Sequence, residues 1–146
     1  MQTNQSQNSK KTVLFLCTGN SCRSQMAEAI VNAHLGESWQ AYSAGTRPTG
    51  YIHPLALKVL DEIGISHNGT SKAATNFIHQ DIDLVVTVCD QAAEDCPVWF
   101  GGTYKVHLGY EDPAAFQGDD HEKLEKFRQL RDTIEKDIPD LLARYQ

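Results

Sequence analysis

Two short runs of residues suited to burial constrain the fold of this chain more than any other feature of its sequence. The first is Val13–Leu16 and the second is Leu84–Val88. Continuous apolar runs of this length are typical of strands covered on both faces, as the central strands of a parallel sheet are. Parallel strands need long crossover connections, which are usually helices. Both runs therefore predict an α/β sheet with helices between its strands.

Apolar residues between the two runs recur at helical spacing. The segment Ala27–Leu35 has apolar residues at i, i+3, i+4 and i+8, which predicts a helix that ends at Gly36. The segment Pro54–Ile63 predicts a second helix, with proline in its first turn and Gly64 as its stop. A further short helix is predicted near Thr75–His79.

Two weaker strands and one long helix complete the predicted elements. Trp39–Ala44 alternates loosely and predicts a second strand, whereas Tyr104–Leu108 alternates as an edge strand does. The last helix is predicted to begin near Asp120, with a kink or a new turn at Pro139. Its predicted buried stripe consists of Leu124, Phe127, Leu130, Ile134 and Leu141.

The order of these elements predicts a single three-layer α/β domain, in which helices flank a four-stranded parallel sheet. We expect the domain to span residues 11–146, after a flexible tail at residues 1–10. Ligands of such sheets bind beyond the carboxyl ends of the strands. The segments that begin at Cys17 and Cys89 each follow a predicted central strand, so they should share one functional edge.

Composition narrows the cellular setting and the class of partner. The chain has 146 residues, four cysteines and a formal net charge of −6. No apolar run approaches the roughly 20 residues that span a bilayer, and Met1–Lys10 is not apolar enough for a secretory signal. We therefore expect a cytoplasmic protein, a monomer without membrane association, whose cysteines are reactive or metal-binding. Its acidic balance argues against nucleic-acid binding.

The segment Cys17–Ser24, with the sequence CTGNSCRS, has the residue types that bind a tetrahedral oxyanion. Between a strand and a helix, the backbone N–H groups of Thr18, Gly19, Asn20, Ser21 and Cys22 can point inward toward the helix N-terminus. Arg23 offers a planar fork to two anion oxygens. The same field favours the nucleophilic thiolate of Cys17, to which Ser24 can hydrogen-bond.

This loop and its continuation, Ser24–Glu28, resemble the low-molecular-weight tyrosine phosphatase superfamily, and more narrowly its arsenate reductase branch. The resemblance runs from about Thr12 to the last helix and includes Tyr42–Gly45 and the segment around Cys89 and Cys96. It implies that Cys17 is the nucleophile. It also implies that Asp112, which precedes Pro113, is the general acid that protonates the leaving oxygen.

The resemblance further implies a thiol relay in which Cys89 resolves Cys17 and Cys96 then resolves Cys89. Phosphatases of the superfamily usually carry tyrosines after the Asp-Pro pair, whereas Ala114, Ala115 and Phe116 follow it here. This difference disfavours an aryl phosphate substrate.

Some members of the reductase branch bind potassium at positions that match Asn20, Glu28 and Ser43. Lys72 stands where an acidic residue would complete that site, so we expect no bound metal and no potassium dependence.

The function expected from the sequence is the reduction of arsenate to arsenite, without a bound cofactor and with thioredoxin as the external reductant. Glutaredoxin and low-molecular-weight thiols remain alternative donors.

Three other interpretations of the sequence stay open. The first is a phosphatase that uses only Cys17, Arg23 and Asp112. The second is a redox sensor or an anion-binding module. The third is a zinc site made by the four cysteines, whose spacing departs from the usual pattern.

Overall fold

The computed structural model describes residues 10–90, 92 and 104–145. Its sheet has four parallel strands in the order β2-β1-β3-β4. The strands are β1 (Lys11–Cys17), β2 (Trp39–Gly45), β3 (Leu84–Thr87) and β4 (Tyr104–His107). The two apolar runs form β1 and β3, which lie at the centre as predicted, and β4 lies at an edge. The predicted parallel α/β sheet is therefore confirmed.

Among the residues that the structure describes, three α-helices and two short 3-10 helices lie between or after the strands. They are α2 (Arg23–His34), α3 (Pro54–Glu62), η1 (Ala74–Phe77), η2 (Pro113–Ala115) and α5 (Asp120–Ala143). Helix α5 begins where predicted because Asp119 and Glu122 form a capping box. Helix η2 was not predicted, since its single turn has no hydrophobic period.

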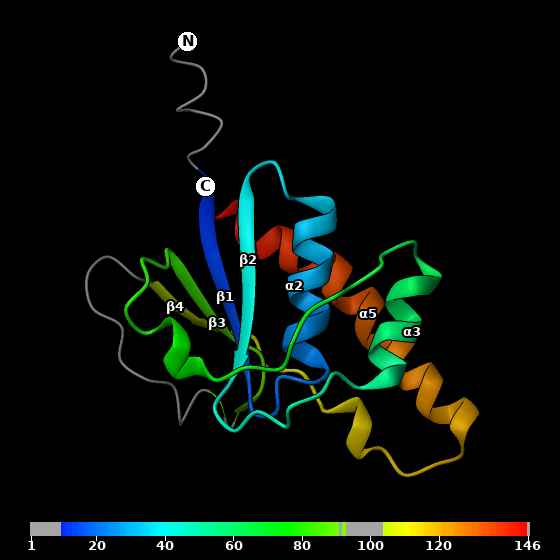
Figure 1. Cartoon of the computed structure of the whole chain (residues 1–146). Helices are drawn as coiled ribbons and strands as arrows, with labels where there is room; N and C mark the ends of the chain where they lie inside the picture. Colours follow the sequence, from blue (N-terminus) through cyan, green and yellow to red (C-terminus); the bar gives the residue numbers. More distant parts are fainter. Residues whose placement is uncertain (1–9, 91, 93–103, 146) are drawn as a thin grey trace.

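Figure 1 shows α2, α3 and α5 on one side of the sheet. Helix η1 packs against β2, where the Phe77 and Tyr42 rings have centroids 5.4 Å apart. On the long helix, Ile138 and Leu142 are buried although the predicted stripe omitted them, and Leu124 is only half-buried. The helix continues through Pro139, so no separate element begins at that residue.

The carboxyl ends of all four strands meet at one edge of the sheet (Figure 1). In the parallel register, Cys17 lies opposite Gly45, and Thr87 lies opposite both Leu16 and His107. The segments that follow β1 and β3 are therefore brought together. Residues 1–9 of the predicted tail lie outside the described residues, as does Cys96.

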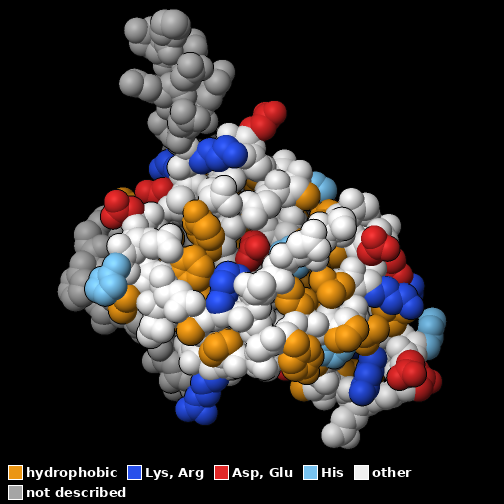
Figure 2. All heavy atoms as spheres, viewed as in Figure 1, with side chains coloured by type: hydrophobic (Ala, Val, Ile, Leu, Met, Phe, Trp, Pro, Cys, Tyr) orange, Lys and Arg blue, Asp and Glu red, His pale blue; other side chains and the backbone are white. Residues whose placement is uncertain are grey.

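On the face drawn in Figure 2, charged side chains of both signs are scattered among apolar and uncharged ones. Within the part of the chain that the structure describes, no helix has the length and apolar character needed to span a bilayer.

Candidate active site

The loop Cys17–Cys22 leads from β1 into α2, and its carbonyl groups are bonded to a neighbouring segment. The carbonyl oxygens of Cys17, Thr18, Gly19 and Ser21 accept hydrogen bonds from the N–H groups of Thr46, Arg47, Thr49 and His53, at 2.9–3.1 Å. In a planar trans peptide the C=O and the following N–H point in opposite directions. Carbonyls directed toward residues 46–53 therefore leave the next N–H groups facing the other way, toward the loop's interior.

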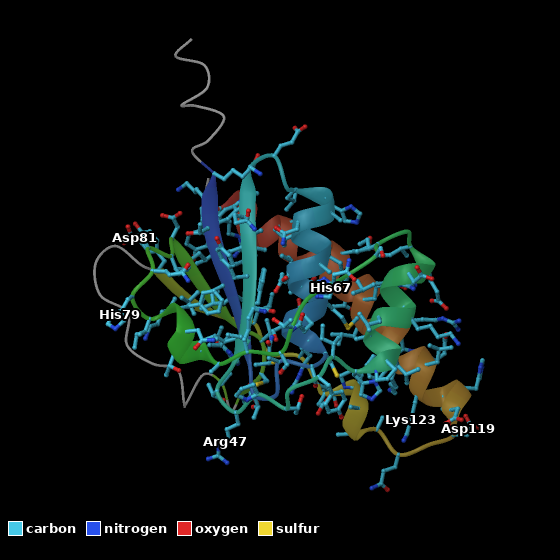
Figure 3. The ribbon with its side chains drawn as sticks, viewed as in Figure 1. Arg47, His67, His79, Asp81, Asp119 and Lys123 are labelled. Carbon is cyan, nitrogen blue, oxygen red and sulfur yellow. The ribbon has the colours of Figure 1, made fainter. Side chains whose placement is uncertain are left out.

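The side chain of Arg47 does not take part in this pairing. It is exposed and points outward, near the carboxyl ends of the strands (Figure 3). Only its backbone N–H contacts the loop, 2.9 Å from the Thr18 oxygen. At the end of β2, Gly45 lies so close that an added Cβ would sit 2.5 Å from the same oxygen. A side chain at position 45 would therefore displace the loop.

Asn20 holds the tightest part of the loop. It is fully buried and has a φ of 51°, in the left-handed region that asparagine tolerates. Its Oδ1 accepts from Gln25 Nε2 at 3.0 Å and from the Lys72 N–H at 2.9 Å. Gln25 also donates to the Asn20 carbonyl, and its own Oε1 contacts His67, which lies beside α2 (Figure 3). These contacts fix a conformation that would otherwise be strained.

Two hydrogen-bond donors converge on the sulfur of Cys17, which is buried. The Asn20 N–H lies 3.3 Å from Sγ, and the Ser24 hydroxyl lies 2.9 Å from it. Ser24 Oγ already accepts a hydrogen bond from Asn20 Nδ2 at 2.8 Å, so its own proton is free to point to the sulfur. This arrangement suits an anionic sulfur, the nucleophilic form of cysteine.

Arg23 is the first residue of α2, and its side chain is 13% exposed. Nη1 donates to the Tyr110 carbonyl at 3.0 Å, and Nη2 lies 3.9 Å from Asp112 Oδ2. The buried Nε has no hydrogen-bond partner among the described residues. A buried donor without a partner is costly. The guanidinium is therefore held in place with a donor free for an oxyanion.

Asp112 has one carboxylate oxygen for structure and one that faces the site. Oδ1 accepts from the Ala114 N–H at 2.9 Å and caps η2, while Oδ2 faces Arg23. The side chain is 41% exposed, so solvent reaches it. The cap made by Oδ1 therefore orients the second oxygen, Oδ2, toward Arg23.

Cys89 is buried just beyond β3, and its sulfur lies 3.4 Å from the hydroxyl of Thr18. The structure therefore brings a second thiol against the loop Cys17–Cys22, which we call the anion loop. Cys22 is also buried, and burial raises the pKa of its thiol to about 12. It stays protonated near neutral pH, which leaves its backbone N–H as its contribution to the loop.

Lys72 lies beside Glu28, one of the positions that match the potassium site of some reductases. Its ammonium lies 3.7 Å from Glu28 Oε1, and the same oxygen accepts from the Ser43 hydroxyl at 2.5 Å. The lysine Nζ also donates to the Thr70 carbonyl at 2.8 Å. Within the described parts of the chain, no group of three or more His, Cys, Asp or Glu side chains is arranged to hold a metal ion.

Three parts of the site were missed at the sequence level: the segment 46–53, Gln25 and the Tyr110 carbonyl. Backbone groups that act through contacts between distant segments of the chain cannot be recognised from the residue types. Gln25 follows Ser24 directly, and its polar amide next to the apolar Met26 and Ala27 was the one available signal.

Residues 12–146 match the family described as low molecular weight phosphotyrosine protein phosphatase. The arsenate reductase of Halalkalibacterium halodurans is 47% identical over 130 residues, which are 88% of this chain and 93% of that protein. A solved arsenate reductase in the phosphate binding state is 30% identical with a TM-score of 0.74, over 93% of this chain and 99% of that one. The thioredoxin-dependent arsenate reductase of Corynebacterium glutamicum is 29% identical with a TM-score of 0.67, over 98% and 67% of the two chains.

Proposed function

The chain belongs to the low molecular weight phosphotyrosine protein phosphatase family, and we propose that it acts within that family as an arsenate reductase. The observation that carries the proposal is the second buried thiol, Cys89, in contact with the anion loop through Thr18. Hydrolysis of a phosphate ester needs one nucleophilic sulfur, whereas reduction of a bound oxyanion needs a second thiol within reach.

Arsenate enters the loop as a tetrahedral oxyanion and meets inward N–H groups, the N-terminus of α2 and the free Nε of Arg23. The Cys17 thiolate attacks arsenic, and a bond forms between sulfur and As(V). Asp112 gives its proton to the departing oxygen, which leaves as water or hydroxide. Cys17 lies on the loop that leads into Arg23, and Asp112 Oδ2 lies 3.9 Å from Arg23 Nη2.

Reduction follows in the second step. The Cys89 thiolate attacks the sulfur of Cys17 and forms a Cys17–Cys89 disulfide. The bond between Cys17 and arsenic breaks, and its electron pair goes to arsenic, which becomes As(III) and leaves as arsenite. Two thiols have then been oxidised and one arsenic reduced by two electrons.

Cys96 completes the relay in this proposal. Its thiolate attacks the sulfur of Cys89, forms a Cys89–Cys96 disulfide and releases Cys17 as a thiolate. A dithiol protein then supplies two electrons to the final disulfide. Thioredoxin is the proposed donor, supported by the thioredoxin-dependent reductase among the similar structures. No bound cofactor is needed in this scheme, and a monomer in the reducing cytoplasm suits it.

The alternative substrate, an aryl phosphate, fits less well beside Asp112. Phe116 is the aromatic side chain available after the Asp-Pro pair, and the Lys126 ammonium lies over its ring at 4.9 Å from the centroid. One face of the ring is therefore already occupied by a cation. Slow hydrolysis of phosphate esters is nevertheless expected, because Cys17, Arg23 and Asp112 are shared.

The test is arsenite formation in the presence of thioredoxin, its reductase and NADPH. The wild-type protein should turn over many times, while Cys89→Ser should form no arsenite. Cys96→Ser should stop after a single turnover. Phosphate ester hydrolysis by the two variants serves as the control and should be retained. Full turnover by Cys96→Ser would contradict the relay.

A further inference from the structure

A chain of hydrogen bonds next to Cys89 has no part in the mechanism above. The ring of His107 on β4 lies between Thr87 at the end of β3 and Asp90, the residue after Cys89. Nδ1 is 2.8 Å from the Thr87 hydroxyl, and Nε2 is 2.9 Å from Asp90 Oδ1. The ring thus bridges both sides of the dipeptide Val88-Cys89.

The direction of these bonds follows from the groups themselves. A carboxylate only accepts, so Nε2 carries a proton and donates to Asp90. In the neutral ring Nδ1 accepts from the Thr87 hydroxyl. In the protonated ring Nδ1 donates, and the hydroxyl turns its own proton toward the Val106 carbonyl, 3.5 Å away. Both contacts of the ring therefore persist in either protonation state.

The pairing of these two strands continues into residues 108–112, the segment that follows β4. The N–H of Leu108 donates to the Thr87 carbonyl at 2.8 Å, and the N–H of Tyr110 donates to the Val88 carbonyl at 2.9 Å. Tyr110 in turn accepts from Arg23 through its own carbonyl. His107 therefore lies where the segment of Cys89 is joined to the segment of Tyr110 and Asp112, which Arg23 contacts.

We propose that His107 is a positioning residue that holds Cys89 against the anion loop by bridging Thr87 and Asp90. The inference rests on the proposed function, since the thiol matters as the resolving group. Asp90 is anchored to the sheet through the ring although its side chain is 91% exposed. Anchoring the residues on both sides of Val88-Cys89 keeps the buried sulfur beside Thr18 Oγ1, 3.4 Å away. A small displacement of a reacting group is costly, so this placement sets the rate of disulfide formation.

His107→Phe tests the proposal, because it keeps a ring and removes both nitrogen contacts. Asp90→Ala removes the other end of the bridge at an exposed position, and Asp90→Asn keeps an oxygen acceptor. Lys105→Ala, an exposed change on the same strand, is the matched control. Two readouts are needed: the rate of Cys89 alkylation by iodoacetamide, followed by peptide mass spectrometry, and the single-turnover rate of Cys17–Cys89 disulfide formation with arsenate.

We expect His107→Phe and Asp90→Ala to speed Cys89 alkylation about fivefold and to slow disulfide formation about tenfold. Inorganic phosphate should bind all variants within about twofold of the wild-type protein, since the anion loop is untouched. Asp90→Asn and Lys105→Ala should behave as the wild-type protein does. Recovery in Asp90→Asn separates positioning by a hydrogen bond from a general loss of structure.

The outcomes distinguish this inference from the function it rests on. Unchanged alkylation of Cys89 in both His107→Phe and Asp90→Ala would overturn the positioning role, even if the wild-type protein reduces arsenate. An equal loss of phosphate binding would overturn it as well, because the damage would not be confined to Cys89. If the wild-type protein forms no disulfide with arsenate, the proposed function fails. The alkylation rates then still decide the role of His107.

Discussion

The hydroxyl of Thr18 lies 3.4 Å from the sulfur of Cys89, although the two residues are 71 positions apart in the chain. Thr18 belongs to the anion loop after β1, and Cys89 follows β3. Parallel pairing of these adjacent central strands places both at the carboxyl edge of the sheet. Because of this contact, the anion loop and the second thiol form a single site.

Replacing Thr18 by valine should slow reduction more than anion binding. Valine is nearly isosteric but removes the hydroxyl from the Cys89 sulfur, while the backbone of the loop is kept. We expect single-turnover disulfide formation to fall about fivefold to tenfold, the value of one hydrogen bond. Phosphate ester hydrolysis is the internal control and should change less than about twofold. Equal losses in both reactions would mean that Thr18 supports the loop as a whole.

Replacing Ser24 by alanine should impair the first chemical step. The variant removes the hydroxyl that lies 2.9 Å from Cys17 Sγ and leaves Asn20 Nδ2 without its acceptor. We expect iodoacetamide to alkylate Cys17 about tenfold more slowly at neutral pH, and reduction and ester hydrolysis to fall together. Ser66→Ala, at an exposed position, is the control. Wild-type alkylation of Cys17 in Ser24→Ala would contradict the assigned direction of this hydrogen bond.

Potassium should not accelerate the protein. The Lys72 ammonium already lies 3.7 Å from Glu28 Oε1 and supplies the positive charge there. We expect equal arsenate reduction rates in KCl and NaCl at matched ionic strength. In Lys72→Asp the built-in cation is lost, so the variant should be slower in NaCl and partly restored by KCl. A KCl effect on the wild-type protein would contradict this reading of Lys72.

Stability at acid pH should depend on Glu62, which joins α3 to α5 through Arg128 and Arg131. Hydrogen bonds from Arg128, then from Arg131, lower the pKa of Glu62 from 4.5 to about 2. Since the folded-state pKa is depressed, the stabilisation is present above about pH 4.5 and is lost as the pH falls through about 2.

The measurement is thermal unfolding of the wild-type protein and Glu62→Gln from pH 7 to pH 2. The difference in melting temperature should be constant above about pH 4.5 and shrink toward zero near pH 2. Glu37→Gln, at an exposed position, is the control. A difference that does not change across this range would show that Glu62 acts through packing alone.

Much of the fold could be predicted because its signals are local. The runs that became β1 and β3 are short and largely apolar, and the capped start of α5 lies in adjacent residues. The anion loop could be predicted for the same reason, since Cys17 to Ser24 are contiguous. Leu141 of the predicted stripe is buried, and the stripe omitted Ile138 and Leu142, which are buried on either side of Pro139.

The parts of the site that were not predicted depend on contacts between distant segments. The N–H groups of residues 46–53 turn the loop's carbonyls outward, and the Tyr110 carbonyl orients Arg23. Neither contribution depends on a side-chain type that a sequence displays. The hydrogen bonds of His107 could not be predicted either, because its partners Thr87 and Asp90 come from another part of the chain.

The central claim is that two thiols of this chain deliver two electrons to one arsenate. The most direct measurement is the amount of arsenite released when fully reduced protein meets excess arsenate without any external thiol. The account predicts about one arsenite for each chain, together with the loss of two free thiols, because two thiols form one disulfide. Arsenite that does not form, or that forms without loss of thiols, would contradict it.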